Sequence, residues 1–213
     1  GIQTFNKFFY DALKENKIQY SIISLHDTNK QGSHIYGCNS NYLKFLYFLI
    51  KLSNSNTINV WQHVTLTTFL PILNVLKKTK SNILTLYGTE IWGKKLSIFK
   101  KIGLMKTDQL WCISNFTAKQ VSQKFNIEEN KLKILPCCIN YNKENFYYKN
   151  PYKKKYNILT ILRLDKSKKL NAVFEMLKAL SEIKKHNKNI HFTIIGDGNY
   201  KNKISKVIKD YNL

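Results

Sequence analysis

The sequence predicts an α/β protein with parallel sheets, divided into two domains. Short apolar runs rich in β-branched residues alternate with amphipathic helical patterns along the 213 residues, as expected for strands joined by crossover helices. A polar stretch rich in Asn, Tyr and Lys interrupts the alternation between residues 136 and 155, and the alternation then resumes. Hydrophobic residues make up 43% of the chain and aromatic residues 13%, which argues against disorder. We therefore expect domains at residues 1–150 and 151–213.

The first domain is expected to begin with a helix. Apolar residues at helical spacing predict it from Gln3 to Glu15, with Gly1 at its N-terminal mouth. Strands are then expected at residues 19–25, 58–61, 83–87, 109–113 and 132–135, with a polar loop at 26–37. Helices are expected at 42–52, 66–76, 94–104 and 117–125. Because the chain opens directly in a helical pattern, without Met, we expect this domain to lack its first strand.

The second domain continues the alternation over a shorter length. Strands are expected at residues 157–162 and 190–195, and helices at 170–185 and 199–209. Two strand–helix units cannot close a domain of this type. The domain is therefore expected to be cut off at Leu213.

The chain is strongly basic, with 35 Lys and Arg residues against 13 Asp and Glu, and a net charge of +22. Such a charge ordinarily indicates nucleic acid or an anionic membrane as the partner. The lysines are spread along the chain, however, and the abundant Lys, Asn, Ile and Tyr residues all have A/T-rich codons. A solvated basic surface is the favoured interpretation, and a protein that binds nucleic acid or an anionic membrane remains an alternative.

The cysteines and the apolar segments indicate the redox environment of the protein and whether it spans a membrane. Cys38, Cys112, Cys137 and Cys138 lie in or beside apolar runs without metal-ligand spacing, which predicts buried, reduced thiols in a cytoplasmic protein. The most apolar segment, residues 42–52, is short and carries two lysines. We expect it to be a core helix and not a membrane span.

Arg163 is the only arginine in the chain, and it follows a predicted strand. Lys166, Lys168 and Lys169 occupy the turn after it. A guanidinium presents a planar fork of donors that matches phosphate or carboxylate oxygens, which an ammonium does not. Arg163 is therefore a candidate anion-binding residue, with a structural arginine paired to a carboxylate as the alternative.

Four stretches of the sequence resemble one enzyme family. They are GIQTFNKFFYDAL, LYGTEIW, CISNFTAKQVSQKFNIEENKLKILPCCIN and ILTILRLDKSKKLNAVFEMLKALSEIKKHNKNIHFTIIGDG. In order and spacing they resemble glycosyltransferase family 4, whose retaining enzymes have the GT-B fold of two Rossmann-like domains. The resemblance implies a Rossmann-like acceptor-side domain lacking its first strand, followed by the start of a Rossmann-like nucleotide-sugar domain. It also implies sugar transfer, with retention, from a nucleotide-diphosphate donor to a glycan or lipid-linked acceptor.

The resemblance assigns catalytic roles in the second domain. Arg163 and Lys168 match the two cations that hold the leaving diphosphate, and they keep the family's separation of five residues. Leu162 and Lys169 replace the glycines of that pattern. Because these cations supply the positive charge, neither a metal nor a cofactor is expected.

Glycines mark two further turns that the resemblance places at the substrate. Gly1 matches the last glycine of the turn at which the donor and acceptor approach a helix N-terminus, with an ordinary N-cap as the alternative. Gly196 and Gly198 fit a turn near the nucleotide, although Asp-Gly is also a common turn pair.

The acceptor side is expected around Tyr87-Gly88, where the family often has His-Gly. A phenol can donate a hydrogen bond but cannot shuttle a proton at neutral pH, so sugar binding is the expected role. Glu90 is a candidate for hydroxyl recognition, with a solvent-exposed carboxylate as the alternative. His63 would line the acceptor side or serve as a structural histidine. Ser114 is expected to cap the following helix.

Partners and alternatives follow from the same resemblance. The expected partners are a nucleotide sugar and a glycan or lipid-linked acceptor, with peripheral contact to an anionic membrane and no specific nucleic acid. The family's Glu-rich motif would lie beyond Leu213, so this chain alone is not expected to complete a donor site. A degraded, inactive transferase is a further alternative. A GT-B epimerase or phosphorylase is not expected to carry this Arg/Lys spacing.

Overall fold

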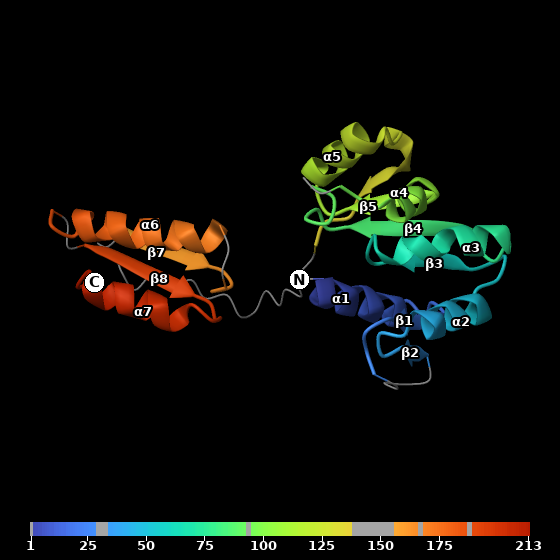
Figure 1. The fold of residues 1–213 in the computed structure, drawn as a ribbon, viewed down its shortest axis with the longest axis horizontal. Coiled ribbons are helices and arrows are strands. Elements are labelled where there is room, and N and C mark those ends of the chain that lie inside the picture. The colour runs from blue at the N-terminus through green and yellow to red at the C-terminus, as the bar shows by residue number, and fades with distance from the viewer. Residues whose placement is uncertain (1, 29–33, 93–94, 138–155, 166–167, 187–188) are drawn as a thin grey trace. The chain divides into compact units, whose positions relative to one another are not determined.

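A computed structural model describes the chain except residues 1, 29–33, 93–94, 138–155, 166–167 and 187–188. The chain divides into two compact units, Gly1–Tyr141 and Asn142–Leu213 (Figure 1). Each unit has its own sheets, helices and hydrophobic core.

The first unit contains most of the elements. They run in the order α1 (Ile2–Glu15), β1 (Ile22–Ser24), β2 (Ile35–Gly37), α2 (Tyr42–Leu52), β3 (Ile58–Trp61), the 3-10 helix η1 (Leu66–Phe69), α3 (Leu70–Val75), β4 (Ser81–Leu86), α4 (Ile98–Met105), β5 (Gln109–Cys112), α5 (Asn115–Phe125), η2 (Glu129–Lys131) and β6 (Leu132–Ile134). The second unit contains β7 (Tyr156–Ile161), α6 (Lys168–Ile183), β8 (Ile190–Ile195) and α7 (Lys201–Asp210).

All described strand pairs are parallel. The main sheet of the first unit has the order β3-β4-β5-β6, and β1 pairs separately with β2. Parallel strands leave their carboxyl ends at a common edge, so the segments after β3, β4 and β5 meet there. This edge of the sheet positions the candidate site.

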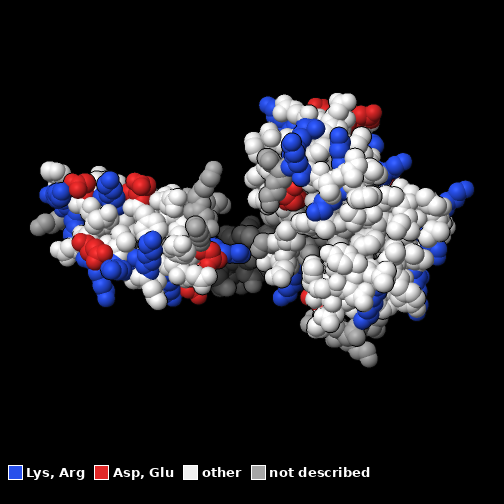
Figure 2. Space-filling model, viewed as in Figure 1, with Lys and Arg blue, Asp and Glu red and all other residues white. Residues whose placement is uncertain are grey.

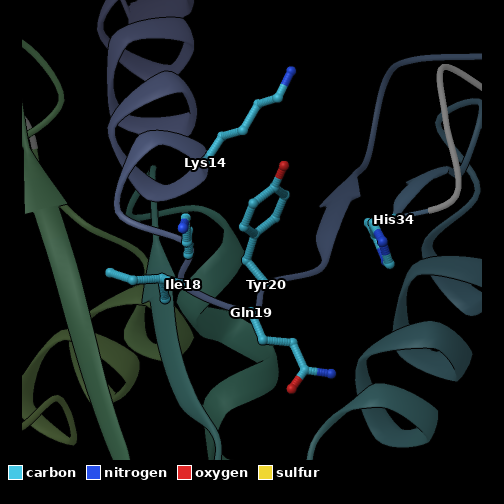
Figure 3. A pocket seen from close by; sticks show the side chains of 6 residues that line it. Lys14, Ile18, Gln19, Tyr20 and His34 are labelled. Atoms are coloured by element: carbon cyan, nitrogen blue, oxygen red, sulfur yellow. The ribbon is translucent and has the colours of Figure 1, made fainter.

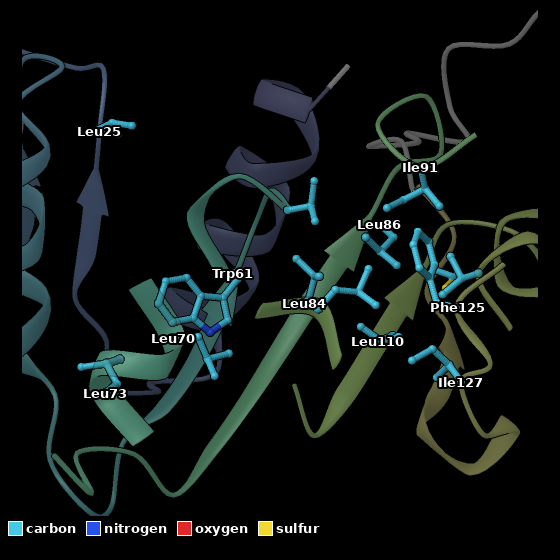
Figure 4. Packing of buried hydrophobic residues seen from close by; sticks show 14 of the residues in the cluster. Leu25, Trp61, Leu70, Leu73, Leu84, Leu86, Ile91, Leu110, Phe125 and Ile127 are labelled. Atoms are coloured by element: carbon cyan, nitrogen blue, oxygen red, sulfur yellow. The ribbon is translucent and has the colours of Figure 1, made fainter. Parts of the chain in front are cut away.

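The core of the first unit lies between the main sheet and its helices (Figure 4). In β4 every residue from Asn82 to Leu86 is buried, as expected for a central parallel strand covered on both faces. Buried Asn82 is satisfied by polar partners: its side-chain Oδ1 accepts from Trp61 Nε1 at 3.1 Å, and its backbone N–H donates to the Asp108 carboxylate at 2.7 Å. The polar groups of Asn82 are therefore hydrogen-bonded within the buried sheet.

The second unit is a β–α–β–α arrangement with a small core. Leu170, Val173 and Leu177 of α6 pack with Ile204 of α7 and with alternate residues of β8. Strands β7 and β8 pair in register from Tyr156 opposite Ile190 to Ile161 opposite Ile195.

The structure corrects four sequence expectations. Strand β2 lies within the predicted loop at 26–37, because a three-residue strand is too short to show alternation. The predicted helix 66–76 is divided into η1 and α3, where Pro71 in the first turn of α3 favours a new helix start. The helix expected from residue 94 begins at Ile98. Cys137 is exposed, so its predicted burial is wrong, whereas Cys38 and Cys112 are buried free thiols.

Candidate functional site

The turn after β4 is built around Gly88. Its backbone has φ +112°, a conformation that glycine adopts without strain. The N–H groups of Ile91 and Trp92 both donate to its carbonyl oxygen at 2.8 Å. A Cβ at this position would lie 2.2 Å from the Trp92 ring. Gly88 therefore allows the chain to fold Trp92 back over the carboxyl end of the strand, where its ring contacts Phe116 edge-on at 5.3 Å.

Glu90 closes this turn. Its carboxylate accepts a hydrogen bond from the Tyr87 backbone N–H at 2.6 Å, and the residue is half-buried. Its negative charge contributes to raising the pKa of the Cys112 thiol, which burial and Glu90 together bring to about 11. Glu90 is thus held at the carboxyl end of β4 by this hydrogen bond, and its half-buried position does not support the alternative of a solvent-exposed carboxylate.

The Tyr87 hydroxyl joins three elements. It lies 2.8 Å from Gln62 Oε1, after β3, and 3.2 Å from Asn6 Oδ1, on α1. One hydroxyl proton serves one acceptor, and rotation of the other amide would let its NH₂ donate to the phenol oxygen. Phe5 packs edge-on against the ring at 5.6 Å. Burial, with smaller effects of Cys137 and Glu90, raises the Tyr87 pKa, so the hydroxyl stays protonated.

His63 follows Gln62 at the same edge. Its Nδ1 accepts a hydrogen bond from the Thr65 backbone N–H at 3.2 Å. Burial lowers the pKa of His63; Glu90 opposes this effect, and Lys100 adds to it. The neutral imidazole therefore carries its proton on Nε2, which is a hydrogen-bond donor.

The first-unit site thus combines neutral hydrogen-bonding groups with one fixed carboxylate. Such a set suits a polyhydroxylated ligand, because hydroxyls donate to a carboxylate and accept from imidazole N–H groups. Asn6 and Gln62 were not predicted from the sequence, since amide side chains at isolated positions carry no pattern. Among the described residues, no group of three or more His, Cys, Asp or Glu side chains could hold a metal ion.

Arg163 follows β7 in the second unit, and its flanking backbone is fixed on both sides. The Leu162 N–H donates to the Ile195 carbonyl at 3.0 Å, and the Leu164 N–H donates to the Asp197 carbonyl at 2.9 Å. The Arg163 side chain is exposed, and no described residue forms an ion pair with it. Within the described part of the chain, the structural alternative of a core-edge ion pair therefore has no support.

Gly196 and Gly198 pack against the Arg163 segment. A Cβ at Gly196 would lie 2.0 Å from the Leu162 carbonyl oxygen. Gly198 has φ +148°, and a Cβ there would lie 2.6 Å from the Leu164 carbonyl carbon. These glycines let the turn after β8 approach the segment that carries Arg163.

Two predicted site residues are only partly described or not described at all. Lys168 opens α6, which places its backbone at a helix N-terminus just after the Arg163 segment; its side chain lies outside the described residues. Gly1 also lies outside the described residues.

A separate cavity lies in the first unit, beside the residues that directly precede β1 and β2 (Figure 3). It measures about 280 Å³, and it is lined by Lys14, Lys17, Ile18, Gln19, Tyr20 and His34. None of the sequence-predicted site residues lines it.

Known structures share the fold of this chain at low sequence identity. The apo form of the lipopolysaccharide outer core galactosyltransferase WaaB has a TM-score of 0.71 at 12% identity, over 100% of this chain and 61% of that one. A variant of S. aureus TarM in complex with fondaparinux, alpha-GlcNAc-glycerol and UDP has a TM-score of 0.54 at 16% identity, over 79% of this chain and 34% of that one. No protein-family model matches the sequence, and no curated protein matches it significantly.

The chain therefore has the Rossmann-like α/β fold of GT-B glycosyltransferases, and the predicted fold class is confirmed. It spans less than two thirds of the length of either structure. The N-terminal domain of Candida albicans trehalose-6-phosphate phosphatase also shares the fold, with a TM-score of 0.52 at 11% identity over 88% of this chain and 50% of that one. Fold alone does not assign the reaction, so the function must be argued from the sites.

Proposed function

We propose that this chain belongs to a retaining glycosyltransferase of family 4 that uses a nucleotide-diphosphate sugar. The observation that carries the proposal is the exposed guanidinium of Arg163 on a backbone pinned at both neighbouring residues. A fixed fork of donors at the carboxyl end of a parallel strand suits a diphosphate.

Lys168 completes the donor side in this proposal. The N-terminus of α6 is the positive end of the helix dipole, which favours phosphate oxygens. As the bond between the sugar and the diphosphate breaks, negative charge grows on the leaving phosphate. Arg163 and Lys168 stabilise that charge more strongly than the ground state, and this difference lowers the barrier.

The acceptor side is assigned to the Tyr87–Glu90 edge. Glu90 accepts hydrogen bonds from sugar hydroxyls, and the neutral His63 donates through Nε2. In the proposed reaction the acceptor hydroxyl attacks the anomeric carbon on the face from which the diphosphate leaves, and its proton passes to the leaving phosphate. No side-chain nucleophile is required, and Tyr87 serves binding and not proton transfer. A glycan or lipid-linked acceptor and a cytoplasmic location complete the proposal.

Nucleotide binding tests this assignment in the full-length protein. UDP, GDP and ADP, each with and without added Mg²⁺, are compared by their effect on the midpoint of thermal unfolding. A rise with at least one of the nucleotides without metal is expected, since binding to the native state stabilises it. If none raises the midpoint with or without Mg²⁺, the donor assignment is wrong.

A basic nucleic-acid-binding protein is the second candidate function, favoured by the net charge of +22. Figure 2 shows Lys and Arg side chains spread over the visible face, with Asp and Glu side chains interspersed among them. Binding to duplex DNA would fall steeply between 50 and 200 mM salt. Sequence-selective binding that persists at physiological salt would favour this alternative.

A further inference from the structure

Two exposed aromatic side chains meet at the carboxyl edge of the main sheet. Trp92 ends the Gly88 turn after β4, and Phe116 lies in the first turn of α5, after β5. Their ring centroids are 5.3 Å apart, with an interplanar angle of 76°. Trp92 is 36% exposed and Phe116 57% exposed. Single exposed apolar residues are normal, but an exposed aromatic pair beside a candidate site points to a ligand.

The backbone that carries Trp92 is fixed. Its N–H donates to the Gly88 carbonyl oxygen at 2.8 Å, and the preceding residue, Ile91, is fully buried. The Ile91 carbonyl oxygen accepts a hydrogen bond from Lys124 Nζ of α5 at 2.7 Å, which ties the turn to the helix that carries Phe116. A ligand that contacts Trp92 therefore pays little for ordering this segment.

The N-cap of α5 fixes Phe116. Ser114 Oγ accepts from the Thr117 backbone N–H at 3.2 Å. Thr117 is fully buried, whereas its neighbour Phe116 is exposed, so the first turn of the helix directs Phe116 outward. Strands β4 and β5 are paired neighbours in a parallel sheet. Both aromatic residues therefore follow strands that end at the same edge.

An aromatic pair next to a carboxylate suits a pyranose ring. The C–H groups on one face of a pyranose carry partial positive charge and are attracted to the negative face of an aromatic ring. The hydroxyls lie around the rim of the sugar, where a carboxylate accepts from them. A carboxylate has more acceptor sites than the single bond from the Tyr87 N–H uses, so Glu90, two residues before Trp92, can also accept from a ligand hydroxyl.

The local charge argues against the other common ligand of an aromatic pair, a quaternary ammonium ion. Residues 91–107 contain five lysines and no Asp or Glu. Helix α5 adds Lys119 and Lys124 and no acidic residue. These surroundings repel a cation, whereas a sugar ring is neutral. A pyranose is therefore the favoured ligand.

We propose that Trp92 and Phe116 form a stacking platform for the acceptor, on which the C–H face of a pyranose ring rests while Glu90 accepts hydrogen bonds from its hydroxyls. The inference rests on the proposed function and narrows it: the group that receives the transferred sugar is itself a sugar ring, and not the phosphate of a lipid carrier. The two rings bind the acceptor and transfer no proton.

Saturation-transfer NMR tests the platform on the full-length protein. The probes are the methyl glycosides of β-D-glucopyranose, β-D-galactopyranose and α-D-mannopyranose. At least one should bind, with the strongest saturation at the C–H protons of one ring face. Trp92→Ala and Phe116→Ala should each weaken binding of that probe by about three- to tenfold. Trp92→Phe, which keeps an aromatic face, should retain most of the binding.

Phe99→Ala is the matched control, because Phe99 is also an exposed aromatic residue (67%) but lies on α4. It should bind the probe as the native sequence does. Trp92→Ala and Phe116→Ala should keep the rise of the unfolding midpoint with nucleotide, since the donor residues lie in the second unit, and this rise shows that both variants are folded.

Binding of a probe that is unchanged in both Trp92→Ala and Phe116→Ala would overturn the platform. Binding of none of the three probes would also overturn it. If choline or a single strand of oligo(dT) binds instead and Trp92→Ala abolishes that binding, the rings serve a cation or a nucleobase. A nucleotide effect without any sugar binding would sink the platform and leave the proposed function standing. Platform-dependent sugar binding without any nucleotide effect would support the platform and refute the donor assignment.

Discussion

The backbone N–H of Tyr87 donates to the Glu90 carboxylate at 2.6 Å, across the Gly88 turn. This bond converts a residue that could have been a solvated surface carboxylate into a fixed group at the edge of the main sheet. Burial is the main cause of the pKa shifts of His63 and Cys112, and the charge of Glu90 acts on both: it opposes the lowering of the His63 pKa and adds to the raising of the Cys112 pKa.

Glu90→Gln tests that role. The amide oxygen can still accept from the Tyr87 N–H, but the negative charge is lost. The pKa of His63 should therefore fall further, and the pKa of Cys112 should fall from about 11 toward its usual value. NMR titration of the imidazole and the pH dependence of thiol alkylation measure the two shifts. Unchanged values of both would show that Glu90 does not act on these groups.

Protonation of His63 should destabilise the fold. Its pKa is lowered in the native state, so the unfolded chain binds the proton more tightly. Stability contributed by neutral His63 is fully present above the unfolded pKa of about 6.5 and decreases as the pH falls below it. Urea unfolding at pH 7.5 and 5.5 measures the difference. His63→Gln should show a smaller loss between these two values than the native sequence, and an equal loss in both would contradict the expectation.

Gly103→Ala should destabilise the protein, although alanine is the better helix former by about 1 kcal/mol. The added Cβ would meet the Thr67 carbonyl at 2.3 Å, so α4 must move away from η1. We expect a net loss of about 1–3 kcal/mol in the free energy of unfolding. A control is Lys101→Ala, at an exposed helix position, which should change the stability by less than about 0.5 kcal/mol. A stabilised Gly103→Ala variant would show that the packing contact relaxes without cost.

Cysteine reactivity should follow burial. Cys137 is exposed, whereas burial raises the pKa of both Cys38 and Cys112. Brief treatment of the native protein with iodoacetamide at pH 8 should label Cys137 and leave Cys38 and Cys112 unmodified. Peptide mass spectrometry reads the sites, and labelling in urea gives the control in which all four cysteines of the chain react. Native labelling of Cys112 at the rate of Cys137 would contradict the described packing.

The alternation of helices and strands could be predicted from the sequence. Each central strand is a short, uninterrupted apolar run, and each helix has apolar residues at helical spacing. Helix α2 agrees with its predicted bounds, and β3 and β8 do as well. Strand β2 was missed because three residues carry too little pattern.

The site could be predicted only where a residue type is unusual at its position. Arg163 stood out as the sole arginine, and Glu90 as a carboxylate two residues after Gly88. The partners of Tyr87, Asn6 and Gln62, come from segments far apart in the sequence. Only the folded sheet edge brings them together, so no local pattern could identify them.

The most direct test of the central claim is nucleotide binding by Arg163→Lys in the full-length protein. The charge is retained and the paired donor fork is lost, so the affinity for the best-binding nucleoside diphosphate should fall by about tenfold or more, while the unfolding midpoint of the free protein stays unchanged. The control Lys206→Gln, on the exposed surface of α7, should bind as the native sequence does. Undiminished affinity in Arg163→Lys would contradict the assignment of this guanidinium to the donor diphosphate.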